Sequence, residues 1–174
     1  GPAERVEEME LILEEITPPD ADDLVAEVTC DEPTLLNPGA EDGEGQPLSR
    51  LAAIDCGVKH NILRELCTRF EVVWCPADMP LEEITRDWSP DALFASNGPG
   101  DPAHPGAATD ARGTLAAAVR QGMPVMGICL GHQTIGQAFG GNVIKCEEIM
   151  HGKIDNIYHF GNSIFKNIEK KFKA

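Results

Sequence analysis

Between residues 51 and 139, short apolar runs alternate with segments of helical periodicity, and this alternation restricts the possible folds more than any other feature. The apolar runs are LAAID (51–55), EVVWC (71–75), ALFAS (92–96) and PVMGI (124–128). Segments with apolar residues at helical spacing follow them, over 59–70, 81–88, 107–121 and 132–139. The pattern predicts an α/β fold, an open and mostly parallel sheet with helices on both faces. Such sheets bind ligands beyond the carboxyl ends of their strands.

The flanking segments are less regular. Residues 4–16 suit an acidic helix, residues 24–29 a short strand, and the Gly- and Pro-rich residues 37–47 a mobile linker. Near the end of the chain, residues 142–149 and 153–160 resemble strands. We therefore expect an acidic lead-in segment and linker over residues 1–50, followed by one domain over residues 51–174.

The charge of the chain limits its partners and its compartment. The 174 residues carry a formal charge of −15, which argues against a nucleic-acid partner because phosphates are repelled. No apolar run is long enough for a membrane span, and the acidic N-terminus lacks the pattern of a secretory signal. These features favour a cytoplasmic protein without a membrane partner.

The six cysteines allow three disulfides, but without a secretory signal we favour reduced thiols. No C-x-x-C pair occurs, so the usual zinc spacings are absent. We expect neither a metal nor a cofactor.

One cysteine has neighbours that indicate chemistry. Gly127-Ile128-Cys129-Leu130-Gly131 places G-x-C-x-G between a strand and a helix, the pattern of a nucleophile elbow with Cys as the nucleophile. The two glycines leave room for a tight turn, and the helix N-terminus beyond it favours a thiolate. The backbone N–H of Leu130 is suited to stabilise an oxyanion. The competing interpretation is a buried cysteine between loop glycines.

A second loop follows the preceding strand of the same sheet. Asn97-Gly98-Pro99-Gly100 is by itself only a turn signal, but beside an elbow Gly98 and Gly100 become candidates for an oxyanion donor and for substrate contact. Gln133 is either a ligand for a polar substrate group or a helix-surface residue. Spacing does not select a catalytic base among the five histidines.

At these residues the chain resembles the class I, triad-type glutamine amidotransferases. The stretches AIDCGVKHNILREL and LFASNGPGDP, with DLVAEVTCDEP upstream and MGICLGHQ downstream, resemble the carbamoyl-phosphate synthetase small chain over about residues 24–133. Residues 134–165 are more similar to the glutaminase subunit of anthranilate or aminodeoxychorismate synthase. The change coincides with a change in basic residues, since all arginines lie at or before Arg120 and six of seven lysines at or after Lys145. A chain joined from two sources is one explanation.

The resemblance implies roles for these residues. Cys129 would attack the side-chain amide of glutamine and form a glutamyl thioester, while Leu130 and Gly98 supply oxyanion donors. Gly98, Gly100, Leu130 and Gln133 would hold the glutamine, and a large synthase subunit would receive the ammonia. The family's base lies in a later His-x-Glu motif, which this sequence lacks, so we expect a C-terminally truncated domain with little activity alone.

Three functions stay open. The first is the glutaminase of a carbamoyl-phosphate synthetase. The second is the glutaminase subunit of anthranilate or aminodeoxychorismate synthase, and the third is a non-catalytic fragment that binds glutamine or a partner. A cysteine-nucleophile hydrolase outside this family is a further alternative, which would have in common with this chain only the nucleophile elbow.

Overall fold

The computed structural model describes all residues except 1–4, 7–8, 11, 14–15, 17–20 and 148–151. The chain forms two compact units, Gly1–Val143 and Ile144–Ala174. The predicted helix over residues 4–16 lies in part outside the described residues. The strand predicted over 142–149 is wrong for residues 142–147, which are exposed and in no strand, and its last two residues are not described.

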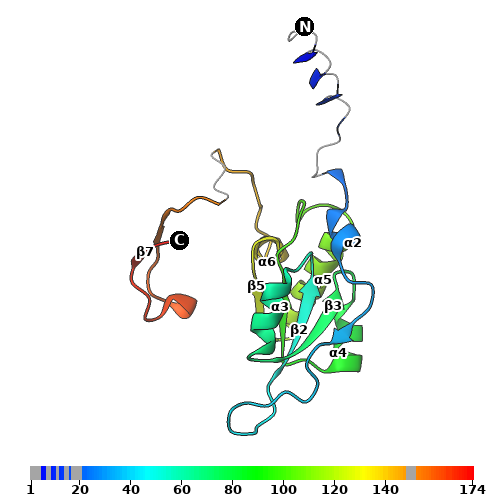
Figure 1. Ribbon diagram of the computed structural model, residues 1–174, viewed down its shortest axis with the longest axis vertical. Helices are drawn as coiled ribbons and strands as arrows, with labels where there is room; N and C mark the ends of the chain where they lie inside the picture. The colour runs from blue at the N-terminus through cyan, green and yellow to red at the C-terminus, as the bar shows by residue number, and fades with distance from the viewer. Residues whose placement is uncertain (1–4, 7–8, 11, 14–15, 17–20, 148–151) are drawn as a thin grey trace. The chain divides into compact units, whose positions relative to one another are not determined.

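The first unit is built on a five-stranded sheet of order β1-β3-β2-β4-β5 (Figure 1). Four strands run parallel, namely β2 (Arg50–Asp55), β3 (Glu71–Pro76), β4 (Ala92–Ala95) and β5 (Val125–Gly127). The short β1 (Thr34–Leu35) pairs antiparallel with β3. The register aligns Ile54 with Cys75 on one side and with Ala95 on the other. The predicted open, mostly parallel sheet is confirmed.

Helices cover both faces of this sheet. They are α3 (His60–Cys67), α4 (Leu81–Trp88), α5 (Ala107–Arg120) and α6 (Leu130–Ala138). Alternate strand residues belong to two separate apolar clusters, as the period of two in a strand requires. Leu51 and Ala53 of β2 share one cluster with Leu63 of α3, whereas Ala52 and Ile54 share the other with residues of α4, α5 and α6.

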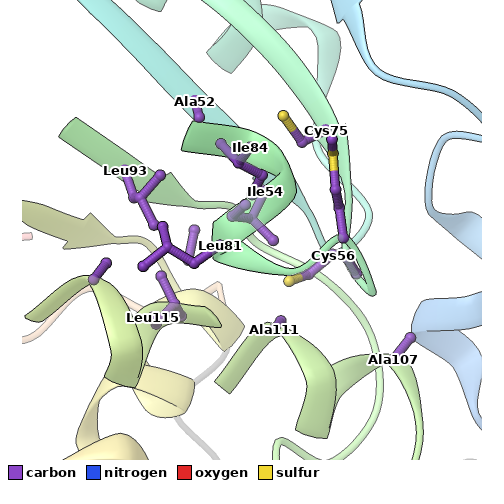
Figure 2. Close-up of a cluster of buried hydrophobic side chains, with 14 of the residues drawn as sticks. Ala52, Ile54, Cys56, Cys75, Leu81, Ile84, Leu93, Ala107, Ala111 and Leu115 are labelled. Carbon is purple, nitrogen blue, oxygen red and sulfur yellow. The ribbon is translucent and has the colours of Figure 1, made fainter. Parts of the chain in front are cut away.

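The larger cluster packs two helices against the middle of the sheet. Figure 2 shows Leu81 of α4 between Leu93 of the sheet and Leu115 of α5, and Ile84 of α4 beside Ile54 of the sheet. The face of α5 toward the core is otherwise mostly alanine, which lets the helix backbone approach the strands closely. Each fully buried leucine or isoleucine contributes roughly 1.5–3 kcal/mol through removal from water, so this cluster stabilises the framework that carries the strand ends.

The strand predicted over residues 24–29 is wrong, because Leu24–Val28 form the helix α2. Asp23 caps this helix by accepting a hydrogen bond from the Ala26 N–H at 3.3 Å. Val25 buries its side chain in the larger cluster. A cap and one buried face decide the conformation of this short segment, rather than its apolar content.

Residues 37–47, predicted as a mobile linker, have defined hydrogen bonds. The Leu48 N–H donates to Ala40 O at 2.9 Å, and Asp42 Oδ1 accepts from the N–H groups of Glu44 and Gln46. Asn37 ties the start of this loop to β3 through the Val72 N–H at 2.8 Å.

A buried glutamate connects the same loop to the sheet. Glu71 Oε1 accepts from the Gly39 N–H at 2.8 Å, and Arg50 Nε donates to Glu71 Oε2 at 2.6 Å. Arg50 Nη1 also donates to Trp88 O at 2.6 Å, at the end of α4. The Gly39 N–H first, and the Arg50 guanidinium second, hold the pKa of Glu71 below its ordinary value.

The second unit contains a two-stranded antiparallel ribbon of β6 (Asn156–Tyr158) and β7 (Lys171–Lys173), with a 3₁₀ turn, η2 (Ser163–Phe165), between them. Part of the strand predicted over 153–160 is therefore confirmed. Among the residues that the structure describes, no helix has the length and apolar character needed to cross a membrane.

Candidate active site

Cys129 lies on a sharp turn where β5 passes into α6, as the elbow pattern predicts. Its backbone angles, φ 53° and ψ −115°, belong to a region that residues other than glycine rarely adopt. The residue is the N-cap of α6, and its side chain is exposed. A thiol therefore stands at the positive end of a helix and is open to solvent.

The two glycines of the motif are required by close packing of backbone on backbone. A Cβ on Gly131 would overlap Ala95 O and lie 2.5 Å from Ala95 C. A Cβ on Gly127 would lie 2.5 Å from the carbonyl carbon of Gly131. The first turn of α6 is thus pressed against the end of β4, which fixes the direction in which Cys129 projects.

Ser96, which sequence reasoning did not select, joins the ends of β2 and β4 to the first turn of α6. Its hydroxyl accepts from the Cys56 N–H at 2.9 Å and donates to Asn97 O at 2.8 Å. Its carbonyl accepts from the Gly131 N–H at 2.9 Å. Ser96 is fully buried, and no sequence pattern identifies it because its partners lie elsewhere in the chain.

Gly98 lies against both the end of β2 and the elbow. A Cβ at this position would overlap Cys56 O and lie 2.9 Å from Leu130 Cδ2. The structure therefore brings together Gly98 and Leu130, the two residues predicted to supply oxyanion donors. Leu130 is the first residue of α6, where backbone N–H groups have no partner within the helix.

The other two predicted substrate residues, Gly100 and Gln133, lie in the loop after β4 and on the first turn of α6. Gly100 is exposed, has a φ of +82°, and faces Leu24 of α2, whose Cβ lies 3.7 Å from the position of a Gly100 Cβ. Gln133 is half-buried on the first turn of α6, and its N–H donates to Cys129 O at 3.0 Å. Neither contact by itself selects a ligand.

Among the described residues of the first unit, no histidine nitrogen is hydrogen-bonded to the thiol of Cys129. His104 Nε2 contacts Ala21 O at 3.2 Å, and both ring nitrogens of His159 are engaged by backbone groups, at Glu169 O and the Gly161 N–H. His132 is exposed on α6. His151 lies outside the described residues.

Three of the other thiols lie in surroundings that suppress ionisation. Burial raises the pKa of Cys56 and of Cys75 to about 12. Burial, followed by the negative charge of Asp55, raises the pKa of Cys30 to about 12. These groups stay protonated at neutral pH, so they are poor nucleophiles.

With the elbow, the adjoining glycine loop and the exposed thiol in place, comparison with known proteins decides the family. Residues 52–174 match the family described as "Glutamine amidotransferase class-I". The chain belongs to this family.

Curated relatives of this class I glutamine amidotransferase include two kinds of protein. The carbamoyl phosphate synthase small chain of Synechococcus sp. is 44% identical over 129 residues, which are 70% of this chain and 32% of the relative. The chloroplastic small chain of Oryza sativa subsp. japonica is 39% identical over 75% of this chain and 30% of its own length. Anthranilate synthase component 2 of Pyropia yezoensis is 35% identical over 60% of this chain and 53% of its own length.

A solved structure agrees on the fold of this amidotransferase. A candidate GMP synthase subunit from Thermoplasma acidophilum superimposes with a TM-score of 0.55 at 24% identity, over 72% of this chain and 62% of that one. The chain spans about a third of the length of the carbamoyl phosphate synthase small chains that it matches.

Proposed function

We propose that residues 51–174 are part of a glutamine amidotransferase domain that serves a carbamoyl-phosphate synthetase as its glutaminase. The observation that carries this proposal is the elbow conformation of Cys129, with Gly98 packed against Leu130 beside it. Because carbamoyl phosphate synthase small chains are among the relatives, we favour a carbamoyl-phosphate synthetase over other synthases as the enzyme that uses the ammonia.

The chemistry follows from the positions of these groups. Cys129 Sγ bonds to the side-chain amide carbon of glutamine, and negative charge develops on the amide oxygen. The N–H groups of Leu130 and Gly98 stabilise this charge by donating hydrogen bonds. The C–N bond then breaks, and ammonia leaves with the proton from the thiol. Water attacks the resulting thioester, which releases glutamate and restores the thiol. Gly100 and Gln133 hold the substrate during these steps.

The partners of this reaction are glutamine and a large synthase subunit that receives the ammonia. We further propose that the protein acts in the cytoplasm. Its acidity, 29 carboxylates against 14 basic side chains, supports the absence of a nucleic-acid partner.

A second candidate function rests on the similarity to anthranilate synthase component 2. In that case the same thioester forms, but the ammonia is delivered to chorismate. A third candidate is a non-catalytic fragment that binds glutamine without hydrolysing it.

Trapping the thioester separates these functions. Hydroxylamine converts a glutamyl thioester to the γ-hydroxamate, so the wild-type chain with glutamine should form hydroxamate slowly, in keeping with the little activity expected of the chain alone, whereas the Cys129→Ser variant should form none. The Cys146→Ser variant, which removes another exposed cysteine, is the matched control and should behave like the wild type. Stimulation by the large chain of a carbamoyl-phosphate synthetase or by the chorismate-binding chain of an anthranilate synthase then identifies the acceptor. Glutamine binding without hydroxamate, in the presence of either chain, would favour the non-catalytic fragment.

A further inference from the structure

The segment that leads into the sheet crosses the loops at the carboxyl ends of three strands. The Cys30 N–H donates to Asp55 Oδ2 at 2.9 Å, at the last residue of β2, and the Ala77 N–H, just after β3, donates to Thr29 Oγ1 at 2.9 Å. Farther upstream, Ala21 O contacts His104 Nε2, after β4. Residues 21–30, which we call the strap, thus border the same sheet edge as Cys129, although the family match begins only at residue 52.

One carboxylate in the strap connects two helices. Asp23 Oδ1 accepts from the Ala26 N–H at 3.3 Å, within the strap, and Asp23 Oδ2 accepts from the Ala107 N–H at 3.0 Å. Ala107 is the first residue of α5, 84 positions along the chain. Helix starts favour both an acceptor and a negative charge, and Asp23 supplies both to α5.

The turn before α5 is shaped around this carboxylate. Gly106 has a φ of +137°, and a Cβ there would overlap Asp23 Oδ2 and lie 2.8 Å from Asp23 Cγ. The carboxylate therefore occupies the space of the missing side chain. Gly106 offers no cap of its own, since no side chain at that position bonds to α5.

The strap and the elbow hold opposite ends of one loop. This loop runs from Ser96 to Gly106, between β4 and α5, and carries Gly98 and Gly100. Its first residues are fixed by Cys56 and Leu130, as described above. Its far end is fixed by Asp23 and by the contact of His104 with Ala21, and Gly100 in its middle faces Leu24.

We propose that Asp23 is a positioning residue of the candidate glutaminase site, which sets the 96–106 loop so that Gly98 and Gly100 face the glutamine that Cys129 attacks. This inference rests on the proposed function for the identity of the substrate. The residue does not touch the reacting atoms, and it acts through the start of α5 and the turn at Gly106.

The test measures substrate recognition separately from thiol reactivity. A chloroketone analogue of glutamine alkylates Cys129, as Sγ bonds to the methylene carbon, chloride leaves and the thiol proton passes to solvent. The concentration dependence of this reaction gives an apparent dissociation constant and a maximal rate. N-ethylmaleimide, which does not resemble glutamine, reports the reactivity of the same thiol, and mass spectrometry of the Cys129 peptide follows both reagents.

Asp23→Ala should raise the apparent dissociation constant of the chloroketone about fivefold, as expected for loss of a helix cap, with an unchanged maleimide rate. Asp23→Asn, which keeps an acceptor oxygen, should lie between Asp23→Ala and wild type. The matched control is Asp22→Asn, because Asp22 is exposed and contributes its carbonyl, not its carboxylate, to the bond with the Leu24 N–H. Equal constants for Asp23→Ala and Asp22→Asn would overturn the proposal.

Amide hydrogen exchange separates this proposal from the proposed function. Asp23→Ala should exchange faster than wild type over residues 97–106 and at the start of α5, and Asp22→Asn should not. If the wild-type chain shows no saturation with the chloroketone, the proposed glutaminase function fails, and the exchange data still decide whether Asp23 positions the loop. Unchanged exchange in Asp23→Ala overturns the positioning role, whatever the chloroketone result. Asp23→Asn supplies the same readouts if Asp23→Ala does not fold.

Discussion

Two glycines of α6 should respond in opposite ways to the same substitution. A methyl group on Gly131 enters the backbone of β4, where it would overlap Ala95 O and lie 2.8 Å from Ala95 Cβ. Overpacking of this kind costs about 1–3 kcal/mol, and because a central strand cannot yield as a flexible side chain does, we expect about 3 kcal/mol. The melting temperature of Gly131→Ala should therefore fall by roughly 6–12 °C.

Gly136 provides the matched control on the same helix. It is exposed, and a Cβ there meets no atom within 4 Å outside the helix's own backbone. Alanine is a better helix former than glycine, so Gly136→Ala should stabilise the protein by about 0.5–1 kcal/mol. The two variants thus differ by about 4 kcal/mol, although the chemical change is identical.

Thermal denaturation followed by circular dichroism measures this difference, and urea unfolding gives the free energies independently. A Gly131→Ala variant that melts within about 2 °C of wild type, a shift that corresponds to less than 1 kcal/mol, would refute the close approach of α6 to β4. Equal destabilisation by both alanines would also contradict the reasoning, because the effect would then belong to the helix and not to the elbow.

Two further predictions concern titratable groups. A limiting amount of N-ethylmaleimide at neutral pH should label Cys129 before Cys30, Cys56 and Cys75, because burial raises the pKa values of these three thiols to about 12. Peptide mass spectrometry measures the order of labelling. Faster labelling of any of the three than of Cys129 would contradict the burial described above. The lowered pKa of Glu71 stabilises the fold above the ordinary glutamate pKa of about 4.3, and this contribution is lost as pH falls through the lower folded-state pKa. Urea unfolding between pH 6 and pH 3 should therefore show a steeper loss of stability for wild type than for Glu71→Gln, and parallel curves would count against the Gly39 and Arg50 contacts.

The sequence predicts the part of the fold whose signals are local. Strands β2 to β5 each carry a short apolar run, and helices α3 to α6 show apolar spacing, so each element is readable within its own residues. The same reasoning fails for Leu24–Val28, where Leu, Val and Val also suit a strand. There the cap at Asp23 and the burial of Val25 among distant residues decide for a helix.

The candidate site likewise contains some residues that the sequence predicts and others that it does not. The elbow is predictable because Cys129 and its two glycines lie within five residues and need one another for steric reasons. Ser96 and Asp23 are not predictable in this way, because their partners lie elsewhere in the chain: Cys56 is 40 positions from Ser96, and Ala107 is 84 from Asp23. Hydrogen bonds across such separations depend on the assembled sheet, and no local pattern reports them.

The backbone conformation of Cys129 has a consequence for anyone who selects improved variants of this protein. A non-glycine residue in such a conformation gives up about 1–3 kcal/mol of folding free energy, which glycine would recover. A screen that rewards expression or heat resistance alone will therefore favour glycine at position 129 and remove the thiol. Every round of such a selection needs a chemical check that residue 129 still reacts.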